Sequence, residues 1–194
     1  MPPETESQLT PRQRQVLDRL ENLVVDEELA DMTMAQIAAQ VNCSLRTLYG
    51  ISPSKEELVM TVMDRRLHRI GRAAIASLNP DDPPLANLRR YLFAANEAVQ
   101  FTAGALVQGF AKFSGARRLT DRHESYVVAV VKSLLDRAMA EGVIERVDSA
   151  ALAHVLGGLG RDFIRADIAA AIAQPPADAA NAVTEILLRG LENR

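Results

Sequence analysis

Apolar residues recur every three or four positions along nearly the whole chain, which is the spacing of one face of an α-helix. The pattern is clearest in residues 16–24, 58–70 and 127–138. Residues 126–131 have the composition of a strand, but the helical spacing continues beyond them to Met139. The Asn-Gly and Asp-Gly pairs that favour tight β-hairpins are missing from the sequence. The chain is therefore expected to be all-α.

Capping residues and helix breakers divide this pattern into separate helices. Thr33 with Gln36 and Ser54 with Glu57 have the spacing of N-terminal capping boxes. Gly50 is expected to end the third helix in a left-handed conformation. The proline-rich run 79–84 breaks the chain. The helices are expected at about residues 11–29, 33–40, 44–49, 54–78, 84–101, 103–114, 120–141 (ended by Gly142), 149–173 and 176–191.

Residues 33–49 carry the most informative local pattern. A helix of two turns is followed by a tight turn and a second short helix, which is the helix-turn-helix layout. The turn needs a residue with positive φ, and Asn42 is the non-glycine residue that tolerates this best. The positions expected to face a small core are Ile37, Ala38, Val41, Cys43 and Leu48. The positions left to point outwards are Leu45, Arg46, Thr47 and Tyr49.

The chemistry of these outward residues suits DNA. Arginine can bond the O6 and N7 atoms of guanine in a major groove about 12 Å wide, and threonine can reach a base edge or a phosphate. The backbone amides at the capped starts of two helices, at Thr33–Met34 and at Ser54–Lys55, are suited to phosphate oxygens. The segment therefore indicates a DNA-binding helix-turn-helix.

At these residues the chain resembles the tetracycline-repressor (TetR) family of bacterial regulators. The resemblance covers residues 12–60, about a quarter of the chain, in register and without a gap. The residues that match the family signature are Thr33-Met34, Ile37-Ala38, Ser44, Thr47-Leu48-Tyr49, Pro53-Ser54-Lys55-Glu56 and Leu58. The resemblance implies a DNA-binding domain over residues 1–57, joined by a long helix to a ligand-binding and dimerisation domain over residues 58–194.

The resemblance also implies a function and a set of contacts. The chain would be a homodimeric repressor that releases a near-palindromic double-stranded DNA operator when an unknown small-molecule effector binds the C-terminal bundle. Tyr49 and Lys55 would contact phosphates, Thr47 a base or a phosphate, and Leu45 and Arg46 would take base-reading positions. The full set of predicted DNA-binding residues is Thr33, Met34, Ser44, Leu45, Arg46, Thr47, Tyr49 and Lys55.

The sequence departs from the family pattern at specific positions. Asn42 replaces the turn glycine, Glu28 and Leu29 replace a glycine and an aromatic residue, and Ile51-Ser52 replaces His-Phe. The last change removes one phosphate-contacting group and one core aromatic. These departures concern the details of docking on DNA more than the fold.

The charge distribution opposes DNA binding. The whole chain has a net charge of −3, but residues 1–57 hold five basic and ten acidic residues, a net of −5. Affinity for DNA rests largely on neutralising phosphates. An alternative hypothesis therefore stays open, in which the chain is a dimeric ligand-binding or protein-interaction module that no longer binds DNA strongly.

Two further features of the N-terminal half have alternative interpretations. Arg65, Arg66, Arg69 and Arg72 either extend a phosphate-binding stripe or form a solvated helix face. Cys43 is either a small core residue or a thiol sensor beside the reading helix. In both cases the structural interpretation is the commoner one for such residues.

The C-terminal half offers candidates for a ligand pocket and for a dimer interface. The pocket candidates are large or polar side chains, namely Phe93, Phe101, Phe110, Phe113, Tyr126, His154 and Arg161. The interface candidates lie on the last two helices and are Leu152, Leu156, Leu159, Phe163, Val183, Ile186 and Leu187. Glycines 157, 158 and 160 are costly within a helix, so we expect close helix packing there.

Other function classes find little support. The three histidines have no metal-ligand spacing, and the sequence contains neither a G-x-S-x-G motif nor a phosphate-binding loop. We therefore expect no catalytic residue, no metal and no cofactor, although a small helical enzyme stays an alternative. The apolar runs are too short for a membrane helix, and the N-terminus lacks the pattern of a secretory signal. With a single cysteine, the chain is expected in the bacterial cytoplasm.

Overall fold

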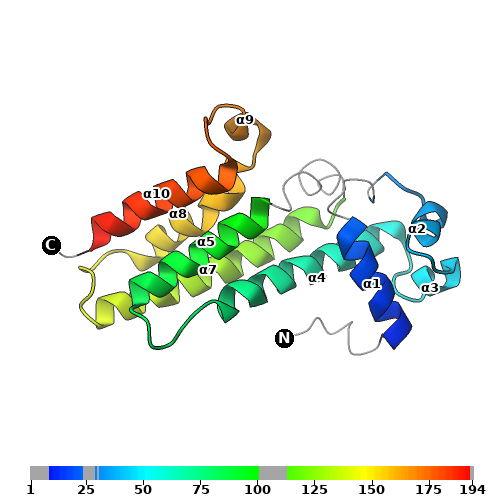
Figure 1. Ribbon diagram of the computed structural model, residues 1–194, viewed down its shortest axis with the longest axis horizontal. Helices are drawn as coiled ribbons and strands as arrows, with labels where there is room; N and C mark the ends of the chain where they lie inside the picture. Colours follow the sequence, from blue (N-terminus) through cyan, green and yellow to red (C-terminus); the bar gives the residue numbers. More distant parts are fainter. Residues whose placement is uncertain (1–8, 24–28, 30, 101–112, 193–194) are drawn as a thin grey trace. The chain divides into compact units, whose positions relative to one another are not determined.

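The computed structural model describes residues 9–23, 29, 31–100 and 113–192. Every named element within these residues is an α-helix, and β-pairing is limited to an isolated bridge between Ile144 and Glu192. The all-α expectation is confirmed. Figure 1 shows the helices α1 (Pro11–Leu23), α2 (Met34–Gln40), α3 (Leu45–Tyr49), α4 (Lys55–Ala76), α5 (Pro84–Gln100), α7 (Ala116–Ala140), α8 (Ser149–Phe163), α9 (Ala166–Ala169) and α10 (Pro176–Leu191).

Most helix starts follow the capping signals in the sequence. Thr33 and Gln36 form a complete capping box, since the Thr33 hydroxyl accepts from the Gln36 N–H while the Gln36 side chain accepts from the Thr33 N–H. The Ser54 hydroxyl accepts from the Glu57 N–H at 3.1 Å. The left-handed ends are also confirmed at Asn42, with φ of 52°, and at Gly142, with φ of 69°.

Two helix ends differ from the expectation. Gly50 has a right-handed conformation, with φ of −77°, because its N–H still bonds the Arg46 carbonyl and the chain continues to turn through Ile51 and Ser52. The expected helix over residues 149–173 ends at Phe163, and the short α9 follows it. Most of the helix expected over residues 103–114 lies outside the described residues.

The chain folds into two compact units. The first takes in residues 1–69 and 102–120, and the second takes in residues 70–101 and 121–194. The boundaries therefore fall inside α4 and near the start of α7, whereas the predicted domain boundary follows residue 57. The physical reason is the core of the first unit, which contains Leu58, Val62 and Leu67 from α4 and Leu119 from α7.

The core of the second unit is built from the facing sides of its helices. Figure 1 shows α5, α8 and α10 lying alongside one another. Leu88 and Tyr91 of α5, Leu156 of α8 and Leu188 of α10 are all completely buried there. The α7 residues Val131 and Leu135 belong to the same apolar cluster.

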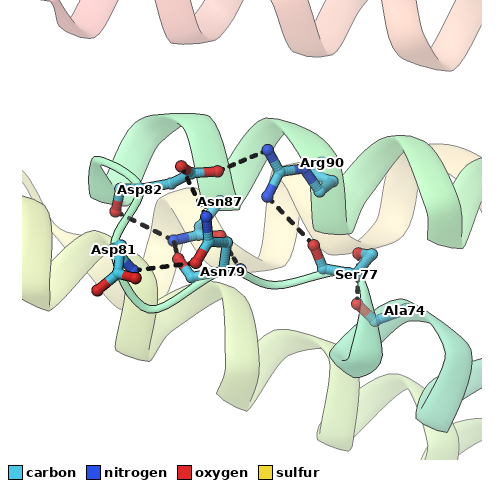
Figure 2. A network of polar contacts seen from close by, with 7 residues as sticks. All are labelled: Ala74, Ser77, Asn79, Asp81, Asp82, Asn87 and Arg90. Atoms are coloured by element: carbon cyan, nitrogen blue, oxygen red, sulfur yellow. Dashed lines mark hydrogen bonds and ion pairs between the residues drawn. The ribbon is translucent and has the colours of Figure 1, made fainter.

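The turn from α4 to α5 is closed by a polar network (Figure 2). Asn87 is buried, and its side-chain amide donates to the Asn79 and Asp82 carbonyls at 2.7 and 3.2 Å. Its side-chain oxygen accepts from the Asn79 N–H at 2.9 Å. Arg90 completes the network through the Ser77 carbonyl and the Asp82 carboxylate. One side chain thus satisfies three backbone groups of a proline-rich turn.

Among the three glycines of α8, Gly160 lies where close helix packing leaves no room for a side chain, as the sequence predicts. A Cβ atom added at Gly160 would lie 2.5 Å from the Asn96 Oδ1 atom of α5. Asn96 is itself buried and donates to the Asn181 side chain of α10 at 2.9 Å. A Cβ atom added at Gly157 would lie 3.4 Å from the side chains of Val127 and Val128 of α7, which is an ordinary contact distance.

We expect Gly160→Ala to lower the free energy of unfolding by about 2 kcal/mol, because Asn96 must move and a buried hydrogen bond is disturbed. Gly190→Ala is the matched control on α10, since a Cβ there meets nothing within 4 Å. Its free energy of unfolding is expected to rise by up to about 1 kcal/mol, because alanine favours the helix more than glycine does. Thermal and urea unfolding of both variants test this. Equal effects of the two substitutions would contradict the packing role of Gly160.

Candidate nucleic-acid interface

Helices α2 and α3 and the turn between them form a helix-turn-helix. The turn passes through Asn42 in its left-handed conformation, and the Cys43 N–H returns to the Ala38 carbonyl at 2.9 Å. Ser44 then caps α3 by accepting from the Thr47 N–H. The local sequence thus specifies both the bend and the start of the second helix.

Helix α3 is buried on one side and open on the other. Leu48 is completely buried, while Leu45 and Tyr49 are 41% and 52% exposed and Arg46 is exposed as well. Among the residues predicted to face inwards, Ile37, Ala38 and Val41 are buried and Cys43 is partly buried against the same core. The predicted division into inner and outer faces is confirmed, apart from Thr47, which is only partly exposed.

The polar residues predicted for DNA binding differ in how far they are already engaged. The Ser44 and Thr47 hydroxyls lie 2.8 Å apart and bond one another. The Thr33 hydroxyl is held in its capping box, and Met34 packs partly buried against the core of the first unit. Lys55 is partly buried at the first position of α4. Leu45, Arg46 and Tyr49 are therefore the predicted residues most open to a partner.

Three side chains of α1 reach the backbone on either side of α3. The Arg19 guanidinium donates to the Val41 carbonyl at 2.9 Å, and that of Arg12 donates to the Asn42 carbonyl at 3.0 Å. The Gln13 amide donates to the Gly50 carbonyl at 2.8 Å. In the sequence, Arg12 and Arg19 stand out only as positive charges. Arg12 and Arg19 are seven residues apart, which puts both on the same face of α1. This spacing is the sequence signal that could have predicted a shared role for them.

A second group of arginines is paired with acids of α1. Arg65 contacts the Asp18 and Glu21 carboxylates at 2.5 and 2.6 Å, and Arg69 contacts Glu21 at 2.9 Å. Glu21 is almost completely buried. Its burial raises the pKa of the carboxyl group, although Arg69 and Arg65 act in the opposite direction. These pairs place Arg65 and Arg69 against α1, where Arg65 is largely buried while Arg69 keeps a solvated side chain that is 54% exposed.

Arg66 and Cys43 are both placed among the packed residues of the first unit. Arg66 is buried, and its Nη1 atom lies 3.4 Å from the Glu21 carbonyl. Burial lowers the pKa of the Arg66 guanidinium. Burial also raises the pKa of the Cys43 thiol. A raised thiol pKa reduces the thiolate fraction and therefore favours the core interpretation of Cys43 over the thiol sensor.

The pocket candidates are divided between the two units and the residues outside the described ranges. Phe101 and Phe110 lie outside the described residues, and Phe113 packs against the core of the first unit. In the second unit Phe93 is partly buried, whereas Tyr126 and His154 are exposed. Arg161 is engaged in ion pairs with Glu124 and Asp162. The described side chains alone therefore do not outline the predicted pocket.

The interface candidates fall into two groups. Leu156 is completely buried in the core of the second unit, and Leu152, Leu159 and Leu187 are partly buried against that core. Phe163 and Val183 are also partly buried. Ile186 is 70% exposed, and Val155, which the sequence analysis did not select, is 52% exposed. Ile186 and Val155 are the large apolar residues of α8 and α10 that face solvent.

No group of three histidine, cysteine or acidic side chains among the described residues is arranged to hold a metal ion. None of the helices in these ranges has both the length and the hydropathy to cross a bilayer.

Known structures match the chain over nearly its whole length. PfmR, a TetR-family transcriptional regulator of Thermus thermophilus, is 23% identical, with a TM-score of 0.63 over 92% of this chain and 99% of that one. A TetR transcription regulator of Haloarcula marismortui is 14% identical, with a TM-score of 0.78 over 95% and 100%. The chain has the TetR-family fold. AibR, solved in complex with isovaleryl coenzyme A and operator DNA, is 18% identical, with a TM-score of 0.63 over 90% and 97%.

The match to TetR-family structures is a match of fold. No model of a known protein family matches this sequence, and no curated protein matches it. The likeness to the TetR family, which the sequence shows over residues 12–60, therefore extends to the rest of the chain as a likeness of fold. At these low sequence identities, the contacts made by single residues of the known structures cannot be assigned to residues of this chain.

The left-handed turn residue of this TetR-like helix-turn-helix gives a direct test. We expect Asn42→Gly to preserve or raise the stability of the protein, because glycine adopts positive φ without strain. Asn42→Ala should lower the free energy of unfolding by about 1 kcal/mol, the cost of a left-handed alanine. Urea denaturation of the two variants measures the difference. Equal stability of the alanine and glycine variants would contradict the observed turn.

Proposed function

We propose that the chain is a ligand-responsive transcriptional regulator of the TetR family that binds operator DNA through α2, α3 and the turn between them. The observation that supports this most directly is the open face of α3. Leu48 anchors the helix in the core, while Leu45, Arg46 and Tyr49 are left exposed on a helix short enough to enter a major groove.

Within this proposal the residues of α3 have distinct roles. Arg46 has the chemistry to bond guanine in the major groove, and Leu45 can pack on a thymine methyl group. Tyr49 and Lys55 contact phosphates. Because the Ser44 and Thr47 hydroxyls bond one another, Thr47 keeps that bond when it accepts from Ser44 and donates its own proton to DNA. Thr33 and Met34 contribute from the start of α2.

The excess of acidic residues over residues 1–57 limits how DNA is held. Arg65 and Arg69 are paired with Asp18 and Glu21, so two acids and two bases of this region neutralise one another. Binding then depends on a few well-placed side chains. The DNA affinity should fall only gently with salt concentration, since the slope of that fall grows with the number of neutralised phosphates.

The proposed regulator acts as a homodimer. Val155 and Ile186 supply exposed apolar surface on α8 and α10, and the partly buried Leu152, Leu159, Phe163, Val183 and Leu187 flank them. Two reading helices about 34–36 Å apart would enter successive major grooves of a near-palindromic operator.

A small molecule bound in the C-terminal region would set the DNA affinity. The complex of AibR with isovaleryl coenzyme A and operator DNA supports both kinds of partner for this fold. The effector changes DNA binding only by the difference between its affinities for two conformations. Helices α4 and α7 each belong to both units, which makes them covalent connections between the units. We propose that the protein is a repressor released by its effector.

A second hypothesis is a dimeric ligand-binding or protein-interaction module that no longer binds DNA strongly. The net charge of −5 over residues 1–57 favours it. The two hypotheses differ in whether the purified protein selects any DNA sequence.

Selection of duplexes from a random-sequence library by the full-length protein tests the proposed function. We expect an enriched near-palindromic sequence, and we expect Arg46→Ala to weaken binding to it by about tenfold or more, the value of one arginine–guanine contact. Fluorescence anisotropy at one fixed salt concentration measures this loss.

Arg146→Ala is the control for this measurement, because it removes an equal charge from an exposed position in the second unit. It should change binding by less than about twofold, as expected of an exposed charge outside the helix-turn-helix. Failure of the wild-type protein to enrich any sequence would favour the module without DNA binding.

A further inference from the structure

We infer that Arg12, Gln13 and Arg19 of α1 are positioning residues that hold the reading helix α3 at both of its ends. This inference rests on the proposed function, since α3 reads DNA only if the protein binds DNA. The three side chains donate to the carbonyls of Asn42, Gly50 and Val41.

The need for such contacts follows from the length of α3. The helix has five residues, far fewer than the roughly 12–15 that an isolated helix needs to be even marginally stable in water. Leu48 is its one buried residue. A single buried side chain fixes the depth of a short helix better than its rotation, so additional contacts are needed to fix the direction of the outer face.

The three acceptors bracket α3 along the chain. Val41 and Asn42 precede it, in the turn where the backbone reverses through positive φ, and Gly50 follows its last residue. Hydrogen bonds from a charged donor are shorter and stronger than neutral ones. The two arginines therefore hold the entry to α3, and Gln13 holds its exit.

The Gln13 side chain is itself held in place. Its Oε1 atom accepts from the Thr10 N–H at 2.8 Å, while its Nε2 atom donates to the Gly50 carbonyl, also at 2.8 Å. The Gly50 backbone approaches so closely that an added Cβ would lie 3.0 Å from Gln13 Nε2. One amide thus ties the first turn of α1 to the end of α3.

A positioning role predicts a specific pattern of DNA binding. Contacts with phosphates raise affinity for every sequence, whereas the orientation of α3 matters only where base edges are read. Loss of a positioning contact should therefore weaken binding to the selected operator and leave binding to a scrambled duplex unchanged.

Gln13→Glu is the first test. It keeps an oxygen for the Thr10 N–H but places an acceptor against the Gly50 carbonyl. Asn22→Asp is the matched control, because it makes the same change from amide to carboxylate at an exposed position of α1. Relative to this control, we expect Gln13→Glu to bind the library-selected duplex about tenfold more weakly, roughly one hydrogen bond plus a repulsion, with equal binding to the scrambled duplex. Equal binding of both variants to the selected duplex would overturn the inference for Gln13.

Arg19→Met is the second test, and it uses the salt dependence of binding. As a positioning residue, Arg19 should contribute about three- to tenfold to binding of the selected duplex without changing the slope of log affinity against log salt. A slope shallower by about 0.9 would show that Arg19 neutralises a phosphate, which would overturn its assignment.

Amide hydrogen exchange separates this inference from the proposed function. In Gln13→Glu we expect the amides of residues 45–49 to exchange about tenfold faster than in Asn22→Asp, because local opening of α3 becomes easier. The amides of α4 serve as the internal reference. If the wild-type protein selects no DNA sequence, the proposed function fails, and faster exchange in α3 still supports the hold by α1. Unchanged exchange in α3 overturns it.

Discussion

Helix α3 cannot form by its own propensity, and the helix-turn-helix depends on this constraint. Five residues supply too few backbone hydrogen bonds to offset the cost of starting a helix. The helix exists because Leu48 enters the same apolar cluster as Val16, Leu17 and Leu20 of α1. Helix α1 thus determines whether α3 forms. The polar side chains of α1 also lie where they can fix the rotation of α3 about its own axis.

The charges of the first unit have a different meaning in three dimensions than in the sequence. Read as a count, the region 1–57 is too acidic to attract DNA. In the structure Glu21 is buried among arginines of α4, and Asp18 pairs with one of them. Charges that neutralise each other inside a unit contribute little to the field that an approaching phosphate experiences. The pairing residues are more than 40 positions apart in the chain, so the count alone could not reveal it.

Local signals predicted much of the fold and failed where distant residues decide the outcome. The capping box at Thr33, the left-handed Asn42 and the glycine packing at Gly160 follow from neighbouring residues or from steric cost, and each was predictable. The right-handed Gly50 and the early end of α8 were not. The burial of Leu156 depends on its surroundings in the folded second unit, which the helical period of α8 does not specify. For the candidate site, the exposed residues of α3 were predictable, whereas the contacts of Arg12, Gln13 and Arg19 with backbone carbonyls require the folded chain.

The network around Asn87 changes what can be done to the chain between α4 and α5. Exposed, proline-rich turns are usually the places where a protein accepts an inserted peptide or is cut by a protease. Here the backbone of Asn79 is bonded at both its N–H and its carbonyl, and the Asp82 carbonyl is bonded as well (Figure 2). An inserted affinity tag or reporter would break these bonds and leave a buried amide without partners. The turn is therefore a poor place to join a fusion partner, despite its exposed position.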